Sequence, residues 1–457
     1  MATSMLTLEQ LPDDVIVVVL QYLPVKDVLD CRLACKRLCI LALHWDVWRH
    51  RSLEDDNPHA GAVLHLAPCL DKLTVTGRVP TLAVTSTRCA VAGLKLHGGA
   101  ALDAPEYALA VRNQESLGRL RRLELETTSI GLRHADALVR TVASCSFLES
   151  IDVVGWLPDV THPVVLGPPR PSLTNFRCPL NSHSISFVDT ILAGHAATLE
   201  KVDLLDVYTS EETRTRTANL LGAMPRLRSL RCSDRLWGLQ DVAECKTLTR
   251  VHIMIHGDVY GKVETVAKLL RRAKQLRSVH LENGRSSEYC SVSAVLVEAL
   301  ASAGRFHLEE LLLEEFDDVR PLLRALPSLP ALRHLDLYAD SAEEPNDELL
   351  ESITPATAPA LRLLEIGEVT QRCPHAWIHG AAVKATLAEN PSLHILLWYT
   401  NRDKCVPQDC EACVTGCHRE IKWGVRKCLG LYSHQPDKCP SLEYHTDDPC
   451  ADSWIHV

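Results

Sequence analysis

Residues 11–48 read LPDDVIVVVLQYLPVKDVLDCRLACKRLCILALHWDVW, and this stretch decides how the chain begins. Pro12 suits the start of a helix, because an N–H in the first turn would have no partner there. Asp13 and Asp14 follow it and favour the positive end of the helix dipole. The stretch therefore opens with a helix signal.

Apolar spacing in the same stretch predicts three short helices. Residues 15–20 alone are a β-branched run that is also compatible with a buried strand. The flanks favour helices, because Pro24 ends the first segment and residues 25–30 and 33–43 offer two further helical patterns. The first helix is expected to carry four apolar side chains on one face: Val15, Val19, Leu20 and Leu23.

The order of residues in this stretch resembles the F-box, a three-helix module found in receptor subunits of ubiquitin ligases. The similarity rests on Leu11-Pro12, Val15, Leu20, Leu23-Pro24, Val28, Leu33, Cys35-Lys36-Arg37 and Val47-Trp48, and it covers residues 5–53. Leu38 and Ala34 depart from the usual aromatic residue and valine. The resemblance implies docking on a Skp-type adaptor that is held in turn by a cullin. The residues implied in that docking are Leu11, Pro12, Val15, Val19, Leu23 and Trp48.

Composition excludes several classes of partner. The 457 residues are 46% hydrophobic, which is ordinary for a folded protein, and 48 basic against 58 acidic residues give a net charge of -10. Neither a basic footprint for nucleic acid nor a polybasic stretch for a membrane is present. No apolar run approaches the roughly 18 residues that span a bilayer, and the N-terminus lacks a secretory signal pattern. We therefore expect a cytoplasmic or nuclear protein whose 18 cysteines are reduced thiols.

A pattern of apolar-x-x-apolar-x-apolar recurs along most of the chain. Its mean period is about 27 residues, within the range of leucine-rich repeats, in which each unit pairs one strand with one helix. The copies begin at Leu70, Val91, Leu120, Leu148, Leu173, Leu199, Leu227, Leu248, Leu276, Leu308, Leu332, Leu361 and Leu393. The poorest copies lie in residues 71–119, where Gly98-Gly99 and Pro105 indicate loops.

Helical patterns lie between the repeat strands. Val266, Leu269, Leu270 and Ala273 fall at helical spacing, as do Leu296, Ala299, Leu300 and Ala303. The sequence therefore predicts an α/β fold. It comprises the F-box, a leucine-rich-repeat solenoid over residues 54–400 with parallel strands on its concave face and helices outside, and a Cys-rich capping segment over residues 401–457.

Strand side chains alternate, so the polar positions of each repeat are expected on the concave face. A basic middle and an acidic patch appear there, and a partner of opposite pattern would bind by steering and register. The candidates for contact with a target protein are Arg228, Arg231, Arg250, His252, Arg277, His280 and Glu310. The alternative is that these charges only keep the solenoid soluble.

The last 53 residues hold seven cysteines. Their local spacing C-x4-C-x2-C-x3-C, followed by histidine, could close a tetrahedral zinc site from Cys405, Cys410, Cys413, Cys417 and His418. The alternative is a capping segment without metal, with a helix carrying Ile421, Val425, Cys428 and Leu429. No cofactor other than this structural zinc is indicated.

Catalytic motifs for hydrolases, nucleotide binding and zinc peptidases are missing, so no enzymatic activity is expected. His418-Arg419-Glu420 matches the H-x-E of zinc deaminases, but the downstream cysteine pair is absent. The leading hypothesis is a substrate-recognition subunit of an SCF-type ubiquitin ligase, whose target protein is unknown. The alternatives are a leucine-rich-repeat scaffold or inhibitor, in which Leu11, Val15 and Trp48 pack inward on the first repeats, and a zinc-dependent enzyme.

Overall fold

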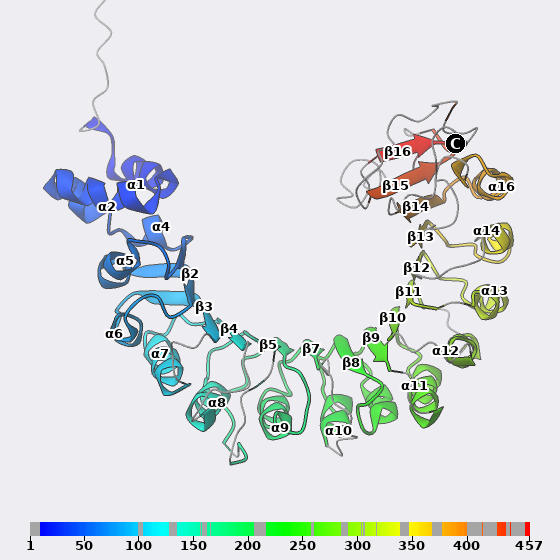
Figure 1. Ribbon diagram of the computed structural model, residues 1–457, viewed down its shortest axis with the longest axis horizontal. Coiled ribbons are helices and arrows are strands. Elements are labelled where there is room, and N and C mark those ends of the chain that lie inside the picture. Colours follow the sequence, from blue (N-terminus) through cyan, green and yellow to red (C-terminus); the bar gives the residue numbers. More distant parts are fainter. Residues whose placement is uncertain are drawn as a thin grey trace, which may run out of the picture. The chain divides into compact units, whose positions relative to one another are not determined.

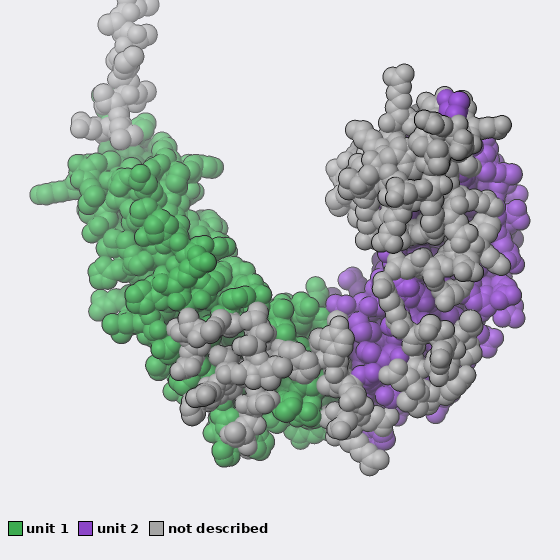
Figure 2. All heavy atoms as spheres, in the orientation of Figure 1, with its two compact units in different colours: residues 1–227 green, residues 228–457 purple. Residues whose placement is uncertain are grey.

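The computed structural model divides into two compact units, residues 1–227 and residues 228–457 (Figure 2). It describes residues 10–98, 104–127, 135–155, 157, 162–164, 166–204, 216–256, 260–284, 291–302, 304, 307–316, 318–338, 347–367, 377–399, 414, 427–435, 439 and 453–457. Among these residues no helix is both long and apolar enough to cross a membrane.

Short helices form the head of unit 1 (Figure 1). They are α1 (Asp13–Tyr22), α2 (Val25–Ala34), α3 (Lys36–Leu41) and α4 (Trp45–Trp48). Their core contains Ile16, Leu20, Val28, Leu41 and Trp48, and Trp48 is 0% exposed. The indole Nε1 of Trp48 donates a hydrogen bond to the carbonyl of Ala42 at 2.7 Å, which satisfies the one polar atom of this buried side chain.

Arg51 ties α1 to α4. Its Nη1 donates to the carbonyl of Leu23 at 2.8 Å and its Nη2 to the carbonyl of Leu20 at 2.7 Å, while its Nε donates to the carbonyl of Val47 at 2.6 Å. The last carbonyls of a helix have no partner within the helix, and a cation near this end also complements the dipole. The head is therefore held as one packed body.

Strand–helix units follow the head in unit 1. The strands β1 to β6 pair in chain order, all parallel, and β7 pairs with β6 in the same sense. The strands are β1 (Ser52–Glu54), β2 (Cys69–Val75), β3 (Ala90–Gly98), β4 (Arg122–Thr127), β5 (Ser150–Gly155), β6 (Asn175–Arg177) and β7 (Lys201–Asp203). The helices are α5 (Ala60–Leu66), α6 (Thr81–Thr85), α7 (Ala104–Ser116), α8 (Ala135–Ser144), α9 (Ile185–Gly194) and α10 (Thr217–Gly222).

Unit 2 repeats the plan, with β8 to β14 parallel and in chain order. The strands are β8 (Ser229–Ser233), β9 (Arg250–Ile255), β10 (Ser278–Asn283), β11 (Glu310–Glu314), β12 (His334–Tyr338), β13 (Leu363–Ile366), β14 (His394–Tyr399), β15 (Lys427–Tyr432) and β16 (Ser453–His456). The helices are α11 (Tyr260–Arg272), α12 (Ser291–Ser302), α13 (Arg320–Ala325), α14 (Asp347–Ser352) and α16 (Ala381–Glu389), with 3-10 turns η2 (Leu239–Glu244) and η3 (Leu326–Ser328).

Within each unit the helices cover one side of the strands (Figure 1). In β9 the side chains of Val251, Ile253 and Ile255 are buried on the helix side, whereas Arg250 and His252 alternate with them. We call the opposite side of the strands the strand face. Each of the thirteen sequence repeats contributes a strand, so the predicted α/β solenoid is confirmed.

Within the solenoid and its cap, the structure departs from the sequence expectations at Pro105 and at Cys428. Pro105 is the second residue of α7 rather than part of a loop, because the first turn of a helix tolerates a missing N–H. Cys428 and Leu429 lie in β15, which pairs antiparallel with β14, so the expected helix is wrong at these two residues, while Ile421 and Val425 lie outside the described residues. A strand satisfies the backbone groups that the edge of β14 would otherwise leave unpaired.

The structure describes eleven of the cysteines and shows no disulfide among them. Most of them lie inside the solenoid, including Cys89, Cys145 and Cys178. Burial raises the pKa of the Cys89 thiol to about 12, so this group is protonated and unreactive near neutral pH.

Candidate interaction surfaces

The outer side of α1 presents four apolar side chains to solvent. Val15, Val18, Val19 and Tyr22 are 39, 49, 44 and 84% exposed, and their spacing places them on one face of the helix. We call these four residues the head apolar face. The opposite side of α1 carries Ile16, Val17 and Leu20, which are buried in the head. Four neighbouring apolar side chains on one helix are more than the scattered single residues of an ordinary surface.

Leu33 and Ile40 add two exposed apolar side chains from α2 and α3. Trp45 of α4 is also partly exposed, but the guanidinium of Arg119 lies 4.3 Å from the centre of its ring. Arg119 also donates a hydrogen bond to the carbonyl of Arg49 at 3.1 Å. Trp45 therefore belongs to the contact between the head and the following repeats.

The chain just before α1 is held in place. Arg37 of α3 donates from Nη2 to the carbonyl of Leu11 at 2.5 Å and from Nε to the carboxylate of Asp13 at 2.7 Å. Pro12 between them is exposed and Leu11 is half-buried. This segment is thus fixed beside the head apolar face.

Most of the residues implied in adaptor docking have accessible surface, with one exception. Val15 and Val19 lie on the head apolar face, Pro12 is exposed, and Leu23 is half-buried like Leu11. Trp48 is completely buried, so its placement at a docking surface is corrected here. Its indole is packed inside the head, where it donates a hydrogen bond to the carbonyl of Ala42.

The expected apolar stripe on α1 is also corrected, because Leu20 is buried while Val15 and Val19 point outward. The scaffold alternative required Val15 to pack inward on the first repeats. The structure instead joins the head to these repeats through α4, which contacts β2. The thiol of Cys69 in β2 lies 3.7 Å from the carbonyl of Trp45 in that contact.

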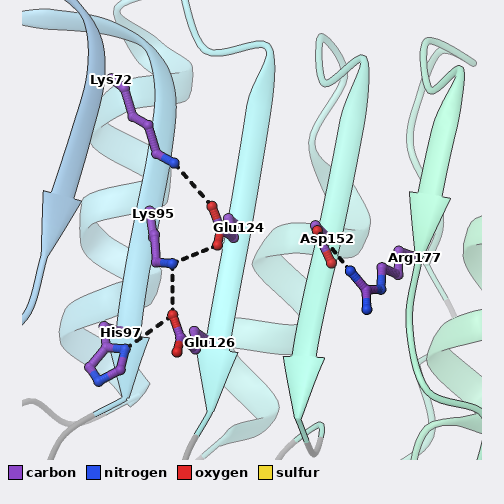
Figure 3. A network of polar contacts seen from close by, with 7 residues as sticks. All are labelled: Lys72, Lys95, His97, Glu124, Glu126, Asp152 and Arg177. Atoms are coloured by element: carbon purple, nitrogen blue, oxygen red, sulfur yellow. Dashed lines mark hydrogen bonds and ion pairs between the residues drawn. The ribbon is translucent and has the colours of Figure 1, made fainter. Parts of the chain in front are cut away.

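The strand face of unit 1 is a network of ion pairs between neighbouring strands (Figure 3). Lys95 Nζ of β3 lies 2.7 Å from Oε1 of Glu124 and 2.7 Å from Oε2 of Glu126, both on β4. Lys72 reaches Glu124 at 3.2 Å and His97 reaches Glu126 at 3.2 Å. Hydrogen bonds from Lys95 and His97 lower the pKa of Glu126. These charges largely compensate one another.

The same compensation continues along unit 1. Arg177 of β6 lies between Asp152 of β5, at 3.7 Å, and Asp203 of β7, at 3.5 Å. Arg122 of β4 lies 2.8 Å from Asp71 of β2. The described part of this face therefore offers few uncompensated charges to a partner.

Two stacked histidines mark the strand face of unit 2. The rings of His252 in β9 and His280 in β10 have centroids 3.7 Å apart and planes 25° from parallel. His252 Nε2 lies 3.0 Å from Glu282, and His280 Nε2 lies 2.9 Å from Glu314. Burial, with His280 and Arg231 nearby, lowers the pKa of His252 to about 3, so His252 is neutral near pH 7.

A second polar cluster follows on β12 and β13. His334 Nε2 lies 2.8 Å from Oε1 of Glu365, whose Oε2 accepts a hydrogen bond from Nε1 of Trp398 at 3.3 Å. Asp336 lies beside Glu365 in the strand register. Burial and then the charge of Glu365 raise the pKa of Asp336 to about 7.

The structure separates the predicted target-binding residues into paired and unpaired side chains. Arg231 lies 4.0 Å from Glu282, and Arg277 lies 3.1 Å from Glu309. Arg228 and Arg250 are exposed, and neither forms an ion pair with another described residue. The backbone amide of Arg250 donates a hydrogen bond to the carbonyl of Arg228 at 2.9 Å, which places these two arginines side by side on adjacent repeats.

Glu310 is exposed on β11, as expected for the acidic side of the face. Sequence reasoning missed His334, Asp336 and Glu365, although all three occupy polar positions of the repeats at Leu332 and Leu361 and were open to the same argument. The predicted metal ligands lie outside the described residues: Cys405, Cys410, Cys413, Cys417 and His418.

Comparison with known families identifies the head. A family model described as F-box-like matches residues 8–54. The chain therefore carries an F-box-like domain at its N-terminus, followed by a leucine-rich-repeat solenoid. No curated protein sequence matches the chain.

Two solved structures are similar to this chain at low identity. The leucine-rich repeat-containing protein LegL7 from Legionella pneumophila is 15% identical, with a TM-score of 0.36 over 80% of this chain and 96% of that one. A chain of the yeast Rad7 and Elc1 complex is 12% identical, with a TM-score of 0.39 over 83% of this chain and 86% of that one.

Proposed function

We propose that this protein is a substrate-recognition subunit of an SCF-type ubiquitin ligase. Its F-box-like head docks on a Skp-type adaptor, the adaptor joins it to a cullin, and the solenoid binds the protein to be ubiquitinated. The observation that carries the proposal is the head apolar face, which lies exposed on α1 within the F-box-like domain.

Burial of this face against an adaptor supplies the favourable free energy of docking. Removing apolar surface from water stabilises a complex by roughly 25 cal/mol per Å². The adaptor surface that contacts Val15, Val19 and Tyr22 therefore needs to be apolar, because a polar surface would lose its contacts with water and gain no hydrogen bonds from these side chains. The head core and the Arg51 contacts hold α1 in place, so little ordering is needed on binding.

The chain contributes proximity in this proposal, and the chemistry occurs on a separate conjugating enzyme. Holding a target lysine near the thioester of that enzyme makes the transfer effectively intramolecular. This division of labour is consistent with the missing catalytic motifs in the sequence.

Replacing Val15 and Val19 together with aspartate tests the docking surface. Both side chains are exposed, so the head should fold normally, whereas a complex would bury two unpaired carboxylates. We expect affinity capture of the tagged full-length chain from cells to recover adaptor and cullin at least about tenfold less than wild type. Quantitative mass spectrometry of the captured proteins measures this.

Leu82→Asp is the matched control, because Leu82 is an exposed apolar residue on α6, away from the head. It should recover adaptor as the wild type does. If Val15→Asp with Val19→Asp retains wild-type amounts of adaptor and cullin, the ligase assignment fails.

The target surface is the strand face of unit 2 around Arg228 and Arg250. These exposed guanidinium groups without ion pairs among the described residues suit a target segment that bears carboxylates or phosphates. The paired charges of unit 1 would have to be separated before they could bind such a segment.

Arg228→Ala with Arg250→Ala should strongly reduce client labelling but leave adaptor capture unchanged. Proximity labelling with and without proteasome blockade measures it: clients are proteins whose labelling rises under blockade with the wild type. We expect their labelling to fall by roughly tenfold, the equivalent of losing about 1.4 kcal/mol of binding. Lys246→Ala, which removes an exposed cation after η2, is the control. Unchanged client labelling by the arginine variant would show that targets bind elsewhere.

A further inference from the structure

Three side chains with metal-binding atoms meet where the C-terminal strands join the last repeat. They are His394 at the start of β14, His434 just after β15, and Cys439. One ligand atom from each lies within 4.8 Å of the other two. Cys439 Sγ and His394 Nε2 are 3.4 Å apart, and the rings of His394 and His434 have centroids 4.8 Å apart with planes at 77°.

Backbone carbonyls orient both histidines. His394 Nδ1 lies 3.3 Å from the carbonyl of Arg362, so a proton on Nδ1 leaves the lone pair of Nε2 directed at Cys439. His434 has a hydrogen bond to the backbone of Pro391, and since proline has no N–H, the ring must donate to the carbonyl. Histidines that bind metals characteristically donate their other ring N–H in this way.

We propose that His394, His434 and Cys439 bind a zinc ion that fastens the C-terminal strands to the last repeat. This site differs from the cysteine cluster suggested by local spacing, since one ligand comes from the last repeat and two come from the tail. Zinc prefers tetrahedral nitrogen and sulfur ligands, and bond lengths of about 2.0–2.1 Å to nitrogen and about 2.3 Å to sulfur put such ligands about 3.3–3.8 Å apart. The 3.4 Å between Cys439 and His394 already meets this requirement.

The location explains why a metal would be useful there. β15 reverses direction relative to β14, and the chain after it is held to α16 by a hydrogen bond from Ser433 Oγ to the carbonyl of Leu387 at 2.7 Å. Trp454 of β16 packs edge-on against His394, with ring centroids 5.5 Å apart. An ion bound to one residue of the last repeat and two of the tail would join these parts more strongly than such contacts alone.

Metal analysis of the purified full-length protein tests the site. The variants Cys439→Ser and His434→Gln should each contain about one zinc ion per chain fewer than the wild type. Cobalt added to the zinc-stripped wild type should give a thiolate-to-cobalt absorption band that Cys439→Ser removes. Cys439→His keeps a zinc ligand, so this variant should retain the zinc while losing the band.

His456→Gln is the control for histidine replacement in this part of the chain. His456 contacts the carbonyl of Ser433 at 3.1 Å, and its donor atoms do not belong to the cluster. It should retain wild-type zinc. Circular dichroism confirms that each variant is folded. Unchanged zinc content in both Cys439→Ser and His434→Gln would overturn the proposal and place any zinc elsewhere, and a wild type that binds neither zinc nor cobalt would overturn it as well.

Discussion

Replacing Trp48 with alanine should destabilise the head by about 3–5 kcal/mol, the usual cost of removing a buried large aromatic side chain. The substitution leaves a cavity among α1, α2, α3 and α4 and deprives the carbonyl of Ala42 of its donor. Faster hydrogen exchange of the backbone amides of α1 and α4 in the full-length protein, with unchanged exchange in β9 to β13, measures the local loss.

Trp45→Ala is the comparison, because Trp45 is half exposed and stacks with Arg119. Its loss should cost only about 0.5–1 kcal/mol. Exchange in α1 that stays as slow in Trp48→Ala as in the wild type would mean that the head does not depend on this core residue.

Adaptor capture and hydrogen exchange, measured on the same variants, separate a folding defect from a docking defect. Trp48→Ala should lower adaptor capture because the head unfolds, whereas Val15→Asp with Val19→Asp should lower it with normal hydrogen exchange in α2 to α4. The two variants share a loss of adaptor capture, but only Trp48→Ala destabilises the head, so together they distinguish the core of the head from its surface.

The repeats were readable from sequence because each one places three apolar residues at a fixed spacing. Leu332, Leu335 and Leu361 are examples, and all three are buried. A strand of the array must bury alternate side chains wherever it occurs, so the same spacing returns in each repeat. β1 has no signal in the sequence, because three residues are too few to show a period. The spacing of Cys428 and Leu429 predicts a helix, because the sequence of β15 does not reveal that the edge of β14 lies beside it.

The orientation of α1 could not be predicted for a related reason. Residues 15–20 are six apolar residues in a row, so the pattern alone has no preferred face. The partners decide it: Trp48 and Arg51 lie on the side of Leu20, and Val15 and Val19 are left outside. Local spacing likewise does not reveal that His394 lies beside Cys439, because the two residues are 45 positions apart in sequence.

Cross-strand pairing on the strand face also lies beyond sequence. The repeat positions of His280 and Glu314 place both residues on this face, but their contact depends on the register of β10 against β11. The sequence therefore located the surface correctly, while the compensation of its charges, which distinguishes Arg250 from Arg277, appears only in the structure.

Asp336→Asn should stabilise unit 2 near pH 8 by about 1–3 kcal/mol. Burial and the neighbouring charge of Glu365 raise the pKa of Asp336 from 3.8 to about 7, so its ionised form is unfavourable in the folded protein. Asparagine has a similar shape and carries no charge at any pH. Urea unfolding of the wild type and the variant at a series of pH values measures the difference.

The sign of the pH dependence follows from which state binds more protons. Between about pH 4 and pH 7 the folded protein holds a proton on Asp336 that the unfolded chain has released, so this group favours folding least at high pH. The advantage of Asp336→Asn should therefore grow as the pH rises through this window and become constant above pH 7. Below about pH 4 the side chain is neutral in both states, and the advantage should vanish.

Glu310→Gln provides the control, because Glu310 is exposed on the adjacent strand β11. It should change stability by less than about 0.5 kcal/mol at either end of the pH range. If Asp336→Asn instead destabilises the protein at pH 8, the ionised carboxylate must be stabilised by its surroundings. The polar cluster of His334, Asp336 and Glu365 would then be a fully satisfied charge network, since only favourable partners could offset the repulsion from Glu365.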